Sequence, residues 1–136
     1  MRNLFIALAL ILSLSGCKKI IDQQKENFVL SVMTEGQWVI TKFVQAGDTI
    51  TSDFAAYTFQ FNRDYSVDAI KESTVESTGI WAGDPDAMNI TASFSNASSP
   101  VSLINGVWHI DQNSLSYVIA SQNNGGEEKS LRLDKK

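Results

Sequence analysis

The chain has 136 residues, enough for one domain, and its 11 basic and 15 acidic residues give a formal net charge of −4. An acidic chain without a basic stripe binds nucleic acid poorly, so we expect no nucleic-acid partner. The sequence contains one cysteine, so no disulfide can form within the chain and the hydrophobic core must hold the domain together.

The N-terminus has the pattern of a secretory signal. Arg2 precedes an apolar run from Leu4 to Leu14, which is too short to cross a bilayer core of about 30 Å as a helix. The run ends in Leu14-Ser15-Gly16-Cys17, which resembles the lipobox of bacterial lipoproteins. The alternative is an ordinary signal peptide followed by a coincidental cysteine.

The lipobox resemblance implies that residues 1–16 are removed as a signal peptide and that Cys17 is acylated, with palmitate or a similar fatty acid. Two or three acyl chains anchor a protein stably, whereas one gives only marginal binding. We therefore expect the membrane as a partner through Cys17, and a lipid-anchored location in the cell envelope at the outer membrane. Whether the protein faces the periplasm or the exterior stays open.

Residues 17–27 are interpreted as the lipidated cysteine and its tether, and residues 28–136 as one domain. Apolar residues at helical spacing predict a short amphipathic helix over about 22–34, with Gly36 as its stop. These apolar residues are Ile21, Phe28, Val29, Val32 and Met33. We expect this stripe to pack on the domain, with a partner protein as the alternative.

After Gly36 the pattern changes to short segments rich in β-branched and aromatic residues, separated by turn signals such as Gly-Asp-Pro-Asp and Asn-Asn-Gly-Gly. Eight such strands without intervening helices predict an all-β fold, because eight is the number at which a sheet can close into a barrel. A sandwich of two four-stranded sheets is the alternative. The expected strands are 38–44, 57–61, 66–70, 79–82, 88–94, 107–110, 115–119 and 130–133.

Gly-x-Trp occurs three times, ending at Trp38, Trp81 and Trp108. Together with the Tyr-x-Phe-x-Phe strand at 57–61, these units resemble the lipocalin-like domains of small bacterial lipoproteins. The resemblance implies an eight-stranded antiparallel up-and-down barrel with a short N-terminal helix. The chain departs from the usual Asp-Gly turn, because Tyr65 follows Asp64; we expect Asp64 or Asn62 to hold the left-handed position.

Strand alternation predicts which large side chains face inward. The interior of an eight-stranded barrel is either filled by side chains or holds one small ligand. The leading hypothesis is an interior pocket for a small hydrophobic ligand, lined by Trp38, Tyr57, Phe59, Phe61, Trp81, Met88, Phe94, Trp108 and Tyr117. Ile40, Ile90, Ile110, Leu115, Ile119, Leu131 and Leu133 are also expected to face inward. The alternative is a filled-core barrel that acts as a surface or periplasmic module for protein or glycan interaction.

No pattern in the sequence predicts catalysis. The only histidine, His109, is expected on the outer face next to Trp108, and neither Gly-x-Ser-x-Gly nor His-Glu-x-x-His is present. Asp84 and Asp86, with Asn89 nearby, are typical of a turn, and a weak cation site is the less favoured interpretation. We expect a monomeric protein that is not an enzyme and has no metal or cofactor.

Overall fold

The computed structural model describes residues 22–136, so the predicted signal peptide, lipobox and Cys17 lie outside the described residues. A helix occupies residues 22–34, which confirms the predicted helix and makes residues 22–27 of the expected tether helical. It ends where Gly36 adopts a left-handed φ of +78°, a conformation that glycine adopts without steric cost. Met33 is buried in the core, whereas Phe28 is 59% exposed.

Nine strands follow the helix in the described part of the chain, and all eight predicted strands are among them. The additions are the short strand β2 and two 3-10 helices, η1 (Thr51–Phe54) and η2 (Val101–Ile104). The strands are β1 (Trp38–Gln45), β2 (Asp48–Thr49), β3 (Tyr57–Phe61), β4 (Ser66–Lys71), β5 (Thr74–Asp84), β6 (Asn89–Ser93), β7 (Gly106–Asn113), β8 (Tyr117–Asn124) and β9 (Glu127–Lys135).

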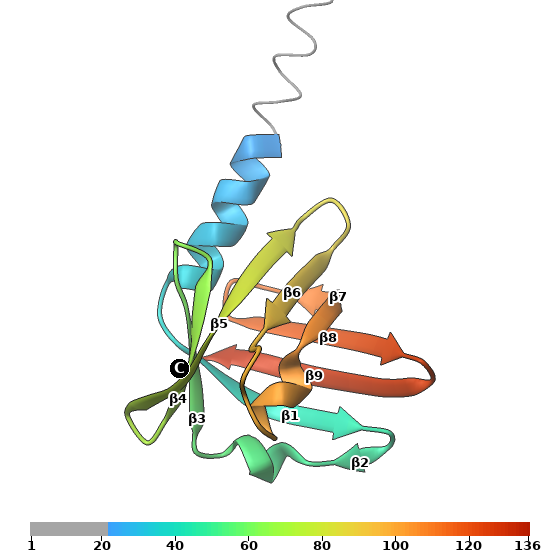
Figure 1. Cartoon of the computed structure of the whole chain (residues 1–136). Helices are drawn as coiled ribbons and strands as arrows, with labels where there is room; N and C mark the ends of the chain where they lie inside the picture. The colour runs from blue at the N-terminus through green and yellow to red at the C-terminus, as the bar shows by residue number, and fades with distance from the viewer. Residues whose placement is uncertain (1–21) are drawn as a thin grey trace, which may run out of the picture.

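The sheet closes on itself. Each strand from β3 to β9 pairs antiparallel with the next, and β9 returns to β1 in a register that runs from Trp38 opposite Lys135 to Gln45 opposite Lys129. β1 also meets β3 at Trp38 and Phe59, while β2 extends only the tip of β1. The result is a closed eight-stranded antiparallel barrel (Figure 1), so the predicted fold class is confirmed and the two-sheet sandwich is wrong.

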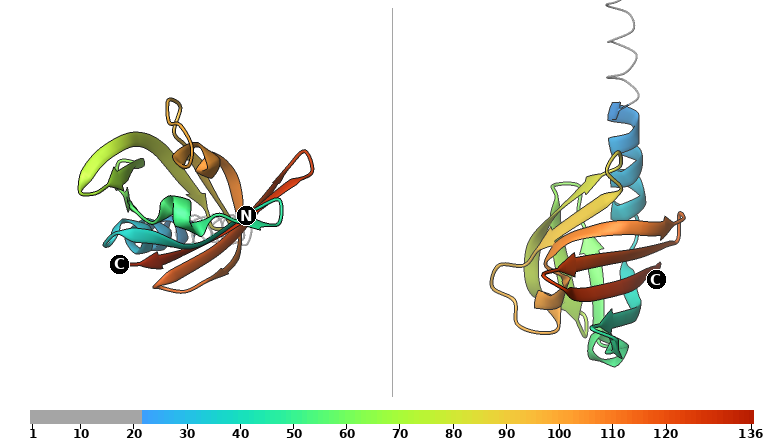
Figure 2. Two further views of the ribbon diagram at one scale, coloured as in Figure 1. Left: turned by 90° about the horizontal axis from the view of Figure 1, so that it is seen from below. Right: turned by 90° about the vertical axis from the view of Figure 1, so that its right-hand side faces the viewer.

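The two ends of the barrel differ in what covers them. The helix end carries the β3–β4, β5–β6 and β7–β8 turns, and the helix lies against this end and projects beyond it (Figure 2, right). The opposite end, which we call the far end, carries the β4–β5 and β8–β9 turns, η1 and η2.

The core is one cluster of aromatic and aliphatic side chains that includes all three indoles. Phe61 meets Trp81 edge-on with ring centroids 5.4 Å apart, and Phe43 meets Trp108 in the same way at 6.0 Å. Small inward residues stand on alternate strands beside these large ones: Ala69 on β4, Ala92 on β6 and Ala120 on β8. Large and small side chains therefore interdigitate, as close packing requires.

The predicted phase of β8 is wrong. Val118, Ala120 and Gln122 face the core, while Tyr117 and Ile119 lie on the outside, half-buried. The stretch Tyr117–Ala120 is apolar at every position, so alternation alone does not fix its phase, and placing the larger residues in the interior gives the wrong one. The aromatic core leaves room only for small residues there, and Tyr117 instead packs its ring 4.5 Å from the Arg132 guanidinium.

Three predictions about turns are also wrong. Met88 and Leu115 were expected inside, but both occupy turns at the helix end and are exposed, Leu115 by 64%. The left-handed residue of the β3–β4 turn is Tyr65, with φ of +66°, and not Asn62 or Asp64. The Asp64 carboxylate instead accepts hydrogen bonds from the backbone N–H and hydroxyl of Ser66, which fixes the turn.

Candidate functional site

The barrel interior has almost no free space. Its void holds about 30 Å³, lined by apolar residues that include Phe59, Phe61 and Phe94. One water needs roughly 10–15 Å³, and ligand pockets occupy about 300–1,000 Å³, so this void is far too small for an organic ligand. Of the residues predicted to line a pocket, seven do converge in the interior, but they fill it: Trp38, Tyr57, Phe59, Phe61, Trp81, Phe94 and Trp108.

The polar atoms of the three indoles are also occupied. Each indole N–H donates to a backbone carbonyl of a neighbouring loop or helix: Trp38 to Met33 at 2.9 Å, Trp81 to Asn62 at 3.1 Å and Trp108 to Ile104 at 2.6 Å. The three Gly-x-Trp units therefore fasten the helix, the β3–β4 turn and η2 to the barrel. Buried indoles satisfied in this way have a structural role.

An apolar groove lies outside the barrel, between the helix and the helix end of the sheet, and we call it the helix groove. It holds about 320 Å³. Hydrophobic side chains line it from both sides, with the polar Asn113 and Ser114 among the lining residues. The hydrophobic lining comprises Phe28, Val29, Val32 and Met33 from the helix, and Ile90, Ile110, Leu115 and Val118 from the barrel.

Upstream of Met33, the polar contacts that hold the helix over this groove are weak. Lys25 forms an ion pair with Asp86 at 3.3 Å, and Arg63 donates to the Ser31 hydroxyl at 3.3 Å. Both contacts are exposed, and an exposed ion pair contributes only about 0–1 kcal/mol. The firm attachment is at the C-terminal end, where Met33 is buried and its carbonyl accepts the Trp38 indole N–H.

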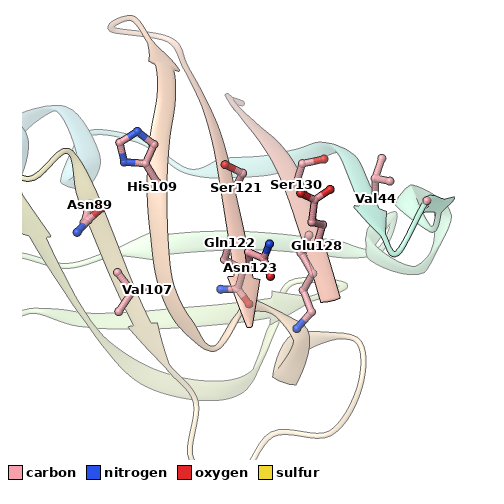
Figure 3. A pocket seen from close by; sticks show the side chains of 11 residues that line it. Val44, Asn89, Val107, His109, Ser121, Gln122, Asn123, Glu128 and Ser130 are labelled. Atoms are coloured by element: carbon pink, nitrogen blue, oxygen red, sulfur yellow. The ribbon is translucent and has the colours of Figure 1, made fainter. Parts of the chain in front are cut away.

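A second concavity, which we call the wall hollow, lies on the outer face of strands β1, β6, β7, β8 and β9 (Figure 3). Its volume is about 510 Å³. Polar side chains from neighbouring strands lie along it, among them His109, which sequence reasoning correctly placed on the outer face. The residues that line it are Val44, Gly47, Asn89, Val107, His109, Ser121, Gln122, Asn123, Glu128, Lys129 and Ser130.

Shifted pKa values occur elsewhere, in structural pairs. The hydrogen bond to the Glu76 carboxylate, together with burial, raises the pKa of Tyr57 to about 12. The Arg132 guanidinium, 2.8 Å away, holds the pKa of Asp134 below its ordinary value. Neither pair lines the helix groove or the wall hollow, so these shifts do not mark a catalytic centre in either concavity.

In the turn that contains Asp84 and Asp86, both carboxylates contact other groups of the protein. Asp84 accepts hydrogen bonds from the backbone N–H groups of Asp86 and Ala87, and Asp86 pairs with Lys25. Within residues 22–136, no three histidine, cysteine or acidic side chains gather in a way that would hold a metal ion. No helix in the same range is both long enough and apolar enough to span a membrane.

No protein-family model and no curated protein sequence matches the chain. Among solved structures, the crystal structure of a DUF4847 family protein from Bacteroides vulgatus is similar, with a TM-score of 0.54 and 11% sequence identity. The match covers 78% of this chain and 96% of that chain. At this identity the likeness shows the fold alone, and the fold it supports is the closed eight-stranded barrel.

Proposed function

We propose that this protein is a lipid-anchored lipoprotein of the bacterial cell envelope, similar to the lipocalin-like lipoproteins, that acts by binding and not by catalysis. The lipobox-like Leu14-Ser15-Gly16-Cys17 supports the anchor, and it lies five residues before the first described residue of the helix. In this proposal the protein is a monomer, located at the outer membrane, and Cys17 carries the acyl chains.

Metabolic labelling with an alkyne analogue of palmitate tests the anchor. We expect the wild-type chain to be labelled and to fractionate with the outer membrane, because acyl chains on Cys17 would insert there. Cys17→Ala removes the only thiol of the chain and should abolish both the label and the membrane fractionation. A Cys17→Ala protein that still carries the label would refute lipidation at this residue.

We further propose that the barrel is a filled scaffold whose ligands bind on its outside, and that the helix groove binds a small hydrophobic ligand. The single observation that carries this proposal is the contrast between the two spaces: about 30 Å³ inside the barrel and about 320 Å³ in the groove. Phe28 and Leu115, exposed by 59% and 64%, leave apolar surface in contact with water at the groove. A ligand that covers them would gain about 25 cal/mol for each Å² of apolar surface buried.

The lining also limits the class of ligand. Among residues 22–136, no charged side chain lines the groove, while the Asn113 amide and the Ser114 hydroxyl are its polar lining groups. An aliphatic molecule with one neutral polar end matches this distribution, because an unpaired ionised group buried among apolar side chains would lose its solvation.

A fluorescent medium-chain fatty-alcohol probe tests this site on the full chain. We expect saturable binding that Leu115→Asp weakens about 10-fold or more, because a buried leucine side chain is worth about 1.5–3 kcal/mol. Val75→Asp is the matched control, since Val75 is an aliphatic residue of similar exposure on the outer wall and lines neither concavity. Equal affinity of the Leu115→Asp variant and the wild-type protein would exclude the helix groove.

The second candidate function is recognition of a macromolecule through the barrel wall. The specific observation in its favour is the wall hollow, which is larger than the helix groove and has hydrogen-bonding side chains from several strands (Figure 3).

A further inference from the structure

The wall hollow is organised by strand register. Asn89 lies opposite His109, His109 opposite Ser121, Ser121 opposite Ser130, and Ser130 opposite Val44. Adjacent strands are about 4.8 Å apart, so the four polar side chains form a line roughly 14 Å long across β6, β7, β8 and β9. A second line parallel to it contains Val107, Asn123 and Glu128, with Asn123 opposite Glu128.

Within residues 22–136, the side chains of Asn89, His109, Ser121 and Ser130 form no hydrogen bond with another protein group, and all four line the wall hollow. Some polar side chains elsewhere on the outer wall do bond one another. Thr78 donates to Asp68 at 2.7 Å, and Asn62 donates to the same carboxylate at 3.2 Å. The wall hollow therefore contains a line of four polar side chains whose donors and acceptors are available to a ligand.

Charge and apolar surface narrow the class of ligand. Glu128 and Lys129 contribute one charge of each sign, so the hollow has no excess of cations that would select a phosphate or another anion. Val44 and Val107 add methyl groups beside the polar line, and Val107 is exposed. A ligand that fits carries many neutral donors and acceptors together with C–H surface.

We propose that the wall hollow binds a neutral, N-acetylated glycan chain. Sugar hydroxyls pair with the hydroxyls of Ser121 and Ser130 and with the His109 imidazole, the acetamido group pairs with the Asn89 carboxamide, and the C–H faces of the sugar rings lie on Val44 and Val107. This inference rests on the proposed function in one respect, namely that the filled barrel binds its ligands on the outside.

His109 provides a direct readout, because it is the only histidine of the chain and lies within the polar line. Titration of the full chain with an oligomer of N-acetylglucosamine should shift the imidazole proton resonances saturably. An oligomer of glucose of the same length, which lacks the acetamido group, should bind at least 10-fold more weakly.

Asn89→Ala combined with Ser121→Ala should weaken binding of the N-acetylated oligomer about 10-fold or more. Thr58→Ala is the matched control, since Thr58 lies on β3, away from the hollow, and should leave the affinity unchanged. Thermal unfolding of each variant verifies that the barrel is intact. Unchanged affinity in the double variant, or the absence of any saturable shift at His109, would overturn the inference.

The same protein samples separate this inference from the proposed function. The fatty-alcohol probe of the helix groove should bind the Asn89→Ala/Ser121→Ala variant as it binds the wild-type protein. Loss of glycan binding with intact probe binding supports two separate sites. Probe binding without any glycan binding by the wild-type protein overturns the glycan proposal alone, as does a protein partner that cross-links to the hollow in place of a glycan.

Discussion

The two ends of the barrel are covered by segments of opposite character. At the far end, η1 and η2 insert Phe54 and Val101, each only 1% exposed, and the Phe54 ring stacks on Phe43 with centroids 4.7 Å apart. At the helix end, Met33 is the fully buried contact of the helix, while Phe28 stays exposed. The far end is thus part of the core, and the helix end retains the apolar surface on which the proposed ligand groove depends.

The largest expected effect of this difference is on stability. Phe54→Ala should lower the free energy of unfolding by about 3–5 kcal/mol, the usual range for truncating a buried phenylalanine. Phe28→Ala should change it by less than about 0.5 kcal/mol, because most of that side chain is already in water. Urea unfolding followed by tryptophan fluorescence measures both. Similar losses in the two variants would show that the helix end is packed as firmly as the far end.

Two glycines on β5 allow the same comparison between the two ends of the barrel, because an alanine at either position adds a single methyl group. A Cβ at Gly79 would collide with the Ser93 carbonyl oxygen and come within 2.9 Å of the Phe94 ring, at the far end. A Cβ at Gly83 would come within 2.9 Å of a Val29 methyl group on the helix.

We expect Gly79→Ala to cost about 1–3 kcal/mol, because backbone atoms cannot move aside cheaply. Gly83→Ala should cost less, since the loosely held helix can shift. Differential scanning calorimetry of the two variants gives the comparison. A larger loss of stability in Gly83→Ala would mean that the helix is the more rigid cover.

How far the sequence predicts this molecule differs between the wall and the ends. The strands and the helix could be predicted, because their apolar residues recur with the period of each element. Trp38, Trp81 and Trp108 were correctly placed inside, since each stands two residues after a glycine near the start of a strand or within one. The phase of β8 could not be predicted, because Tyr117–Ala120 has two apolar faces.

Both concavities were beyond sequence reasoning for a different reason. The helix groove brings Phe28 beside Leu115, two residues far apart in the chain that meet only after the barrel closes. The wall hollow depends on the register of five strands, and a shift of one residue in β8 would replace Ser121 with an inward-facing residue. His109 could be placed on the outer face, but the residues beside it could not be identified.

The far end also contains a titrating pair. Tyr57, at the start of β3, donates to the Glu76 carboxylate at 2.6 Å, and its pKa is raised from 10.0 to about 12. The folded protein therefore holds this proton more tightly than the unfolded chain does. The resulting stabilisation is complete below about pH 10 and is lost as the pH rises from about 10 to about 12.

Glu76→Gln removes the negative charge and should bring the Tyr57 titration midpoint back towards 10, as measured by phenolate absorbance. Tyr57→Phe is the control, because it should remove the high-pH step altogether. The effect on stability at neutral pH is smaller than that of Gly79→Ala, because solvent screens this near-surface pair. A high-pH step that survives Glu76→Gln unchanged would show that burial alone raises the pKa.

A modest stabilising effect is expected at the β4–β5 turn, which is exposed at the far end. Glu72 and Ser73 both hold left-handed conformations, with φ of +50° and +69°, in a two-residue hairpin between Lys71 and Thr74. Such a turn favours Asn-Gly, because a left-handed non-glycine residue costs roughly 1–2 kcal/mol. Glu72→Asn with Ser73→Gly should therefore raise the free energy of unfolding by about 1 kcal/mol in urea titrations.

The same double substitution separates stability from binding. It lies outside the residues that line the helix groove and the wall hollow, so the affinities for the fatty-alcohol probe and the N-acetylated oligomer should not change. Tyr65 and Met88, at the helix end, are left-handed too, with φ of +66° and +55°, and they combine that strain with exposed apolar surface. If the double substitution stabilises the protein without changing either affinity, the strain at Glu72 and Ser73 has no role in binding. The strained apolar turns at the helix end are then the ones to test for a role in ligand binding.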